Sequence, residues 1–314
     1  MTGELRSGDG LLAELDARLG SWDAELAARY PGDPGTRQPV HTVYVPADRF
    51  HADTVGRWGA QARQLLAEHA PDPVSLAAAA DVDTDLVGAV YARVVAKLHR
   101  EPVEDLRVDF EDGYGTRNDD EEDDAATTAG ATLALVLAAG DGPFSAGVRF
   151  KCLEAGTRRR GVRTLELVLG RLLAEGPLPA GFLVTLPKVT SPAQVAAMVG
   201  ICERLEQAYG MSAGVLRFEI QVETPQAIIG RDGTVGVSRM IDAAAGRCTG
   251  LHYGTYDYSA AAGVAAAYQS MEHPVADYAK AVMQVAAAGT GVRLSDGSTN
   301  VVPVGDADHV RTAW

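Results

Sequence analysis

The sequence has few cysteines and no long apolar run. Three cysteines occur in 314 residues, at positions 152, 202 and 248, and none belongs to a CxxC pair. This spacing excludes a disulfide framework and a zinc site built from cysteines. No uncharged apolar stretch is long enough to span a bilayer, and the N-terminus carries acidic residues early. We therefore expect a cytoplasmic protein that is not exported and does not enter the membrane.

Positive charge is also scarce. The chain has 28 Lys and Arg against 42 Asp and Glu, a net charge of -14, and a pI near 4.9. Nucleic acid and anionic membranes would be repelled over most of such a surface, so both are excluded as partners. No GxGxxG motif follows the first predicted strand, which argues against a dinucleotide-binding sheet.

Short β-rich runs alternate with helical segments rich in alanine and leucine. They predict strands at 42–45, 106–110, 146–151, 182–186, 217–222 and 248–253, and a seventh within 291–305 with a DG turn and a short hairpin. Strands separated by helices in this way form a parallel sheet. Seven such units predict an α/β fold of the TIM-type (β/α)8 barrel class, whose active sites lie at the C-terminal ends of the strands.

The chain divides at about residue 38. Leucines and Trp22 at helical spacing over 11–30 predict an amphipathic helix, so we assign 1–38 to an N-terminal helical extension and 39–314 to a single barrel domain. Residues 53–100 predict two or three helices before the second strand. The barrel is expected to lack its last strand and helix in this chain. The N-terminal helix, the segment 301–305 or another subunit should then cover the open edges.

The stretch LRVDFEDGYG, residues 106–115, concentrates acidic residues at the end of a strand. Asp109 and Glu111 share one face of the strand, Phe110 points to the other, and Asp112 begins the loop. A solvated turn is the alternative for this stretch taken alone. The recurrence of a strand, a polar tip and a helix along the chain favours a functional site instead.

A barrel would collect the polar residues at the strand tips around one rim. They are Asp48, Arg49, Asp109, Glu111, Asp112, Arg149, Lys188, Glu223 and Asp257. Carboxylates without clustered cysteine or histidine form the oxygen-ligand set that suits Mg2+ or Mn2+ and leaves room for a small anionic substrate. The lone His41 and His252 are expected to be packed and hydrogen-bonded.

Charge also gathers in two runs outside these tips. The acidic run 118–124 precedes a helix, where it interacts well with the helix dipole, so we assign it no chemistry. The basic group Arg158, Arg159, Arg160 and Arg163 follows the third strand. These arginines either pair with the acidic run or line an anion site, for example one for the phosphates of CoA.

The ordered motifs VYVPADRF, VDFEDGYG, VRFK, LPKVTSP, VETP and GTYDY resemble the HpcH/HpaI aldolase and citrate lyase β-subunit family of the phosphoenolpyruvate and pyruvate-binding barrels, over roughly residues 40–305. The resemblance implies that Glu223 and Asp257 bind a divalent metal and that Arg149 contacts the substrate. It further implies that Asp109, Glu111 and Asp112 hold metal-bound waters and assist proton transfer.

This resemblance implies a Mg2+-dependent carbon-carbon lyase or aldolase, acting on a 2-oxo acid, a hydroxy acid or its CoA thioester through a metal-stabilised enolate. Arg49, Arg149 and Lys188 are the expected substrate-binding cations, and a homo-oligomer is expected. Alternatives are phosphoryl-transfer or hydrolytic chemistry on a phosphoenolpyruvate-like acid, and a non-catalytic metabolite-binding barrel or complex subunit. The family commonly has an eighth strand and a later histidine-proline pair, which this sequence does not show.

Overall fold

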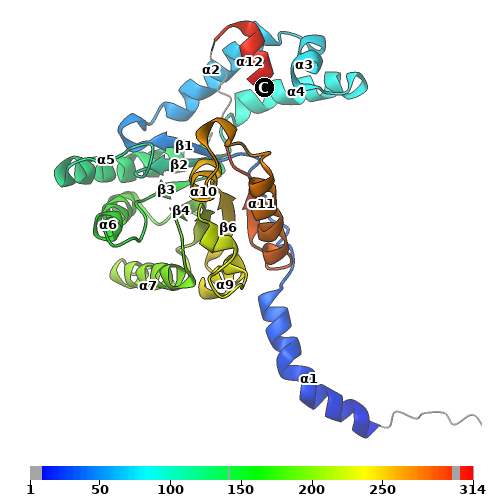
Figure 1. Ribbon diagram of the computed structural model, residues 1–314. Helices are drawn as coiled ribbons and strands as arrows, with labels where there is room; N and C mark the ends of the chain where they lie inside the picture. The colour runs from blue at the N-terminus through cyan, green and yellow to red at the C-terminus, as the bar shows by residue number, and fades with distance from the viewer. Residues whose placement is uncertain (1–8, 141, 299–304, 314) are drawn as a thin grey trace, which may run out of the picture.

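The computed structural model describes residues 9–140, 142–298 and 305–313. Its centre is a curled sheet of seven parallel strands in the order β1 to β7, each paired with the next strand along the chain (Figure 1). The strands are β1 (Val43–Pro46), β2 (Asp105–Asp109), β3 (Ser145–Arg149), β4 (Phe182–Leu186), β5 (Phe218–Val222), β6 (Cys248–Tyr253) and β7 (Arg293–Ser295). The first six confirm the predicted strands to within two residues at either end.

Helices connect successive strands, as the sequence predicts. They are α1 (Asp9–Arg29), η1 (Ala47–Arg49), α2 (Thr54–His69), α3 (Pro73–Ala80), α4 (Thr84–Arg100), α5 (Asp119–Ala138), α6 (Arg158–Glu175), α7 (Pro192–Ala208), α8 (Pro225–Ile228), α9 (Gly236–Ala243), α10 (Thr255–Ala261), η2 (Ala266–Tyr268), α11 (Pro274–Ala287) and α12 (Ala307–Ala313). In the described part of the chain, no helix combines the length and apolar character needed to cross a bilayer.

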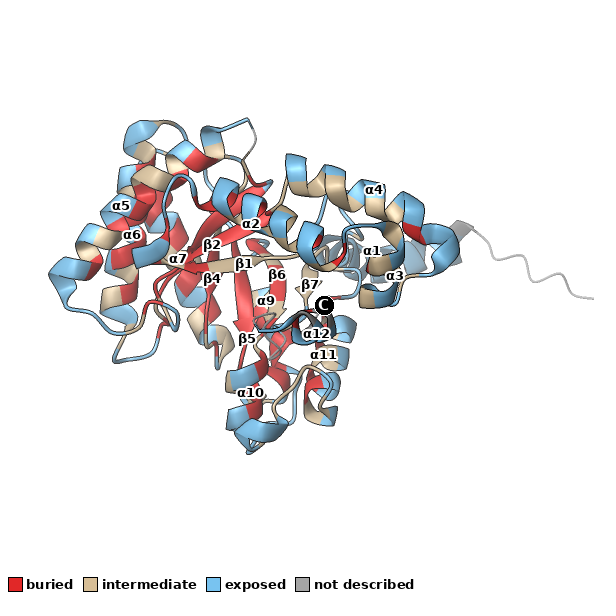
Figure 2. Ribbon diagram, turned by 90° about the horizontal axis from the view of Figure 1, so that it is seen from above, coloured by how far each residue is buried: buried red, intermediate tan, exposed pale blue. Residues whose placement is uncertain are grey.

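The strands bury apolar side chains on the face that the helices cover. Leu106, Val108 and Phe110 are fully buried, and Ile220 and Val222 continue the same core from β5 (Figure 2). Because side chains alternate along a strand, the intervening residues point to the inside of the curl. There the residues are polar, and the register aligns Asp109 with Arg149. The apolar core therefore lies between sheet and helices, and the polar chemistry lies inside the sheet.

One side of the curled sheet is not closed by strand pairing. β1 and β7 do not pair with each other among the described residues. The segment after α1 runs along β7 instead: the Gln38 side chain donates to the Leu294 carbonyl at 2.8 Å, and Arg293 donates to the Thr36 carbonyl at 2.7 Å. We call this opening the seam. The polypeptide after α1, and not α1 itself, borders it, while residues 301–304 and the predicted hairpin there lie outside the described residues.

One group of helices and one single helix extend beyond the sheet, although Val55 and Trp58 at the start of α2 still pack with the main core. The three helices α2, α3 and α4 lie between β1 and β2 and share a small separate core around Leu66, Leu76 and Val87, and α12 packs against α2 and α3. Helix α1 projects away from the rest of the molecule (Figure 1). Its residues are exposed throughout from position 10 onward. The extension predicted at the N-terminus is thus an isolated helix on the described structure.

Candidate active site and metal centre

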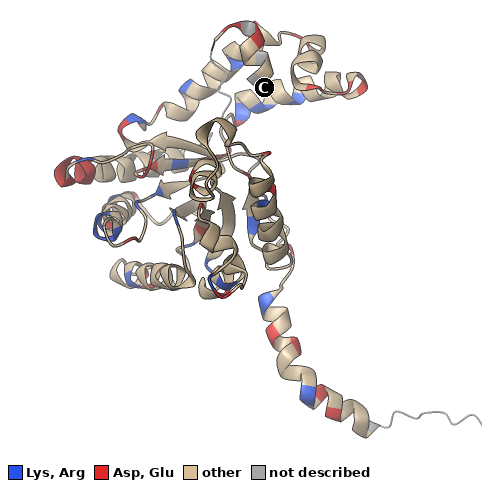
Figure 3. Ribbon diagram, viewed as in Figure 1, with Lys and Arg blue, Asp and Glu red and all other residues tan. Residues whose placement is uncertain are grey.

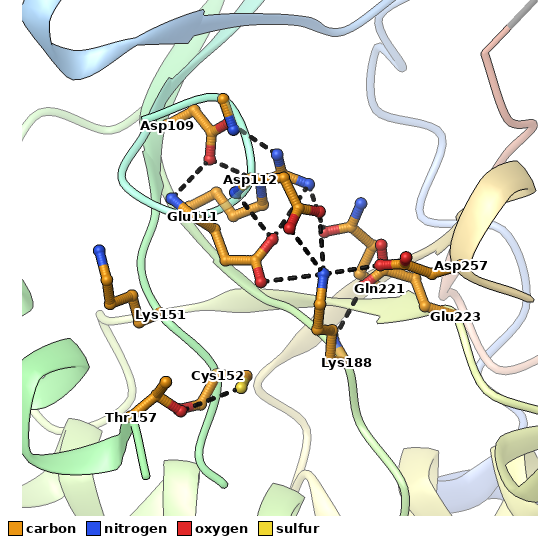
Figure 4. A network of polar contacts seen from close by, with 12 residues as sticks. Asp109, Glu111, Asp112, Lys151, Cys152, Thr157, Lys188, Gln221, Glu223 and Asp257 are labelled. Atoms are coloured by element: carbon orange, nitrogen blue, oxygen red, sulfur yellow. Dashed lines mark hydrogen bonds and ion pairs between the residues drawn. The ribbon is translucent and has the colours of Figure 1, made fainter. Parts of the chain in front are cut away.

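The C-terminal ends of β2 to β6 bring together seven charged residues, which we call the rim cluster (Figure 4). They are Asp109, Glu111, Asp112, Arg149, Lys188, Glu223 and Asp257. β2 and the loop after it supply the first three, Arg149 ends β3, Lys188 and Glu223 follow β4 and β5, and Asp257 lies in α10. Arg49, also predicted as a substrate contact, lies exposed in η1 and does not line the pocket at this rim.

Asp109 holds Arg149 in place. Two parallel hydrogen bonds of 2.7 Å join the Arg149 guanidinium to the two Asp109 oxygens. The same carboxylate accepts the backbone N–H groups of Glu111 at 2.9 Å and Gly113 at 2.8 Å. A Cβ at position 113 would lie 2.5 Å from Asp109 Oδ2, so glycine permits this close turn. Asp109 therefore orients Arg149 and the acidic loop together.

Three carboxylates converge beside this pair. One oxygen from each of Asp112, Glu223 and Asp257 lies within 4.8 Å of the others, with Glu223 buried and the other two exposed. Oxygens on opposite sides of a Mg2+ ion lie about 4.2 Å apart, so small side-chain adjustments would bring the three into one coordination shell. The site joins Asp112 to the predicted ligands Glu223 and Asp257, whereas the sequence grouped Asp112 with the proton-transfer residues.

Gly254 makes room for the buried member of this trio. A Cβ at position 254 would lie 2.3 Å from Cγ of Glu223, a separation that no folded structure tolerates without movement. Glycine at the start of the GTYDY motif thus lets Glu223 turn toward Asp257. The donor set, with three carboxylates and no nitrogen or sulfur, fits Mg2+ or Mn2+.

Lys188 supplies the positive charge at the point where the carboxylates meet. Its Nζ lies 2.9 Å from Glu111 Oε1, 2.8 Å from Asp112 Oδ2 and 2.6 Å from Asp257 Oδ2. Its backbone N–H donates to Glu223 Oε2 at 2.9 Å. Lys188 has a φ of 51°, a left-handed conformation that is uncommon for a residue other than glycine. Strained backbone of this kind is frequent at binding sites.

The charges of the rim cluster are not balanced. Five carboxylates face two cations, and burial makes ionisation costly for the innermost acids. Burial, followed by the contact with Asp112, raises the pKa of Glu111 to about 7. Burial also raises the pKa of Glu223, in spite of the nearby Lys188. For Asp112 burial acts in the same direction, but the Lys188 ammonium outweighs it and lowers the pKa.

A pocket of about 520 Å³ opens between the rim cluster and the seam. Tyr44 lines it from β1, and the Arg149 guanidinium lies over the Tyr44 ring, 4.7 Å from its centroid. The Tyr44 hydroxyl is buried and has no hydrogen-bond partner among the described residues. Burial raises its pKa, so it remains a proton donor. The sequence reasoning missed Tyr44, although alternation in VYVP places it opposite the core residue Val45.

A second polar group, the inner network, lies deeper inside the sheet. It consists of Asp105, Arg107, Ser145, Thr185, Glu219 and His252. Arg107 is fully buried, and its guanidinium makes two 2.9 Å hydrogen bonds to Glu219. The Nη1 atom of Arg107 forms an ion pair with Asp105. His252 lies 2.9 Å from Glu219. His252 and His41 are therefore packed and hydrogen-bonded, as predicted.

The inner network was not recognised from the sequence. The signal was present as alternating polar residues in two strands: Asp105, Arg107 and Asp109 on β2, and Glu219 and Gln221 on β5 with Glu223 directly after it. Such alternation gives one strand face a polar lining, and opposite charges on two strands of one barrel are expected to meet. Burial opposes ionisation of Glu219, yet Arg107 and His252 together hold its pKa below the ordinary value.

The basic group after β3 pairs in part with the acidic run. Arg160 and Arg163 both contact Asp123 of α5, and Arg160 also lies 3.5 Å from Glu122. Figure 3 shows the acidic start of α5 beside the basic start of α6. The acidic run begins the helix with Asn118 as its cap, which accepts the Glu121 N–H at 2.9 Å. Arg158 instead lines an open pocket between α6 and the loop after β4.

The fold and the rim cluster define an α/β protein with a curled parallel sheet, polar on its inside and acidic at the C-terminal ends of its strands. The chain belongs to the family described as "Domain of unknown function (DUF6986)", whose model matches residues 19–314. No curated protein matches the chain in sequence.

Solved structures resemble the chain in fold. A citrate lyase from Burkholderia xenovorans has 21% identity and a TM-score of 0.50, and the match covers 68% of this chain and 61% of that one. An HpcH/HpaI aldolase/citrate lyase family protein from Burkholderia cenocepacia has 18% identity, a TM-score of 0.43 and coverages of 64% and 74%. A malate synthase from Haloferax volcanii has 13% identity, a TM-score of 0.43 and coverages of 67% and 63%.

Proposed function

We propose that the protein is a divalent-metal-dependent carbon-carbon lyase or aldolase acting on a 2-oxo acid, a hydroxy acid or its CoA thioester. The observation that carries this proposal is the convergence of Asp112, Glu223 and Asp257 within 4.8 Å beside the fixed guanidinium of Arg149. Mg2+ or Mn2+ bound there would stabilise the negative charge of an enolate oxygen. The shared fold with a citrate lyase supports the reaction class by analogy only.

The chain's own residues divide the remaining work. Among the described residues, Arg149 Nη1 contacts Gln221 at 3.3 Å and Glu111 at 3.8 Å, and we assign this nitrogen to the substrate carboxylate. Glu111, with a pKa of about 7, is suited to accept and return a proton near neutral pH. The unpaired Tyr44 hydroxyl is suited to donate a hydrogen bond to a substrate oxygen inside the pocket.

The proposal extends to the fold and the location. We take the seven-stranded sheet to be a TIM-type barrel that lacks its last strand and helix in the described chain, with the seam at the missing position. The three cysteines are buried and free. Such cysteines are typical of a reducing compartment, so we place the protein in the cytoplasm.

The test is exchange of the methyl protons of pyruvate with D2O, followed by NMR in the presence of Mg2+ or Mn2+. We expect metal-dependent exchange by the parent, and its loss in Glu223→Gln and Asp257→Asn. Glu203→Gln, on the exposed face of α7, is the matched control and should exchange like the parent. A parent that binds the metal and pyruvate without exchange would instead be a metabolite-binding barrel.

Titration calorimetry with Mn2+ separates the metal site from the chemistry. Both rim variants should lose most of the binding heat, while the control keeps it. If the rim variants bind Mn2+ as the parent does, the assigned metal centre is wrong. If a phosphoenolpyruvate-like acid is hydrolysed and pyruvate is not enolised, the phosphoryl-transfer alternative replaces the lyase.

A further inference from the structure

Helix α1 carries an uncovered row of large apolar side chains. Leu12, Leu15, Leu19, Trp22 and Leu26 each leave 42–56% of their surface accessible. The helix projects from the molecule, and an ion pair of 3.3 Å between Arg29 and Asp242 ties only its last turn to the body (Figure 1). Apolar rows of this size on an otherwise charged helix mark a surface that meets another protein.

The spacing of the row identifies its partner. The five residues follow one another in steps of three, four, three and four, which are the a and d positions of a heptad repeat. Asp16, Arg18, Asp23 and Glu25 flank the row at e and g positions, where Leu11 is the one apolar residue of α1, whereas a helix that packs on a globular core commonly has an apolar e or g position in every heptad. We propose that α1 pairs with α1 of a second copy of this chain in a two-stranded coiled coil.

The flanking charges fix the direction of the two helices. In a parallel pair, a g residue meets the e residue of the next heptad on the other helix, so Arg18 faces Asp23 of the second copy, and this attraction occurs twice. An antiparallel pair brings Asp16 of one helix near Asp23 of the other, where the carboxylates repel, and brings Arg18 near Glu25, where the charges attract, so the two effects offset each other. The charges therefore favour the parallel arrangement.

The base of α1 is fixed firmly enough to bring the two barrels together. Gly32 N–H donates to the Gly289 carbonyl at 2.8 Å, directly after α11. A parallel pair places the bodies of both copies at the same end of the coiled coil. The α11 helices of the two copies then lie near each other. The outer face of α11 exposes Tyr278 at 52% and Val285 at 78%. Because two heptads alone make a weak coiled coil, contact through this face adds to the pairing of α1.

Light scattering after gel filtration tests the pairing with matched variants. Leu15→Glu/Leu19→Glu places two charges in the row, and Ala17→Glu/Ala24→Glu places the same charges on the opposite face of α1. We expect twice the 32.9 kDa of one chain for the parent and the control, and the mass of one chain for the Leu variant. All of these positions are exposed, so folding should persist and far-UV circular dichroism checks it. A monomeric parent, or a Leu variant with the parent's mass, overturns the proposal.

Cross-linking and charge exchange test the direction. Leu12→Cys should form a disulfide between copies under mild oxidation, because position 12 lies near one end of α1 and its two copies meet only in a parallel pair; the native cysteines are buried. Arg18→Glu should raise the dimer dissociation constant several-fold, and adding Asp23→Arg should restore it. No cross-link at position 12, or no rescue by the second change, would overturn the parallel arrangement.

Discussion

The rim cluster and the inner network lie one above the other inside the curled sheet and use the same kinds of side chain. In the inner network, Arg107 is fully buried and every charged neighbour meets it or His252 directly. In the rim cluster, Asp112 and Asp257 are exposed and share the single ammonium of Lys188. A complete set of buried pairs supports the fold, whereas the excess of carboxylates at the open rim leaves negative charge that the proposed metal ion would neutralise.

The two ends of β2 show the same contrast between two glutamates that are seven positions apart. Glu104, just before the strand, is buried, yet its bonds to Lys97 and the Val40 N–H outweigh burial and lower its pKa to about 2. Glu111, just after the strand, is also largely buried, and its pKa rises to about 7. The two ends of one strand thus hold a carboxylate that is fully paired and one that is not.

The largest expected effect is on the inner network. Arg107→Met leaves Glu219 and Asp105 buried without their cation, and breaking a buried ion pair costs about 3–5 kcal/mol. Urea unfolding should show this loss. Asp112→Asn at the rim should stay within about 0.5 kcal/mol of the parent, because it removes excess charge. Equal losses of unfolding free energy in the two variants would contradict the difference between the inner network and the rim cluster.

Glu104→Gln should reduce stability by about 1.5–3 kcal/mol at pH 7, the range for hydrogen bonds to charged groups. The folded pKa lies below the ordinary value of 4.5, so this stability is present above about pH 4.5 and is lost as the pH falls toward 2. The slope of unfolding free energy against pH over this window should therefore be flatter in the variant. An unchanged slope would show that Glu104 is not held ionised by its partners.

Gly254→Ala should lower Mn2+ affinity by about 10–100-fold, as changes next to metal ligands do. The added Cβ displaces Glu223, because only 2.3 Å is available to Cγ. Gly88→Ala in α4 is the control, since nothing lies near its added methyl group. Calorimetry measures both variants, and equal affinities would mean that Glu223 binds no metal in this position.

Lys188→Met should raise Mn2+ affinity by about 2–10-fold, because the ammonium and the metal compete for Asp112 and Asp257. Pyruvate exchange should fall at the same time if the ammonium also contacts the substrate. The same Mn2+ titration provides the measurement. A weaker metal site in the variant would show that Lys188 organises the carboxylates and does not compete.

The sequence predicted the repeated strands because alternation and turn residues are local signals. It predicted Glu223, Asp257 and Arg149 at one rim because parallel strands end on the same side. It did not predict that Lys188 would sit between Asp112 and Asp257, since that contact depends on the path of three separate loops. Arg107 and Glu219, separated by 112 positions, also meet only in three dimensions.

The seam has a consequence for the order of folding. Neighbouring strands are also neighbours in sequence, but Gln38 and Leu294 are 256 residues apart. The loss of conformational entropy makes closing a loop of that length cost about 1.6 kcal/mol more free energy than closing one of about 40 residues. The seam should therefore close last and open first, and native-state hydrogen exchange should be slowest in β3, β4 and β5 and fastest in β1 and β7. Thermal opening would then start beside the pocket, which Thr42 and Tyr44 line together with Ser295, Asp296 and Gly297.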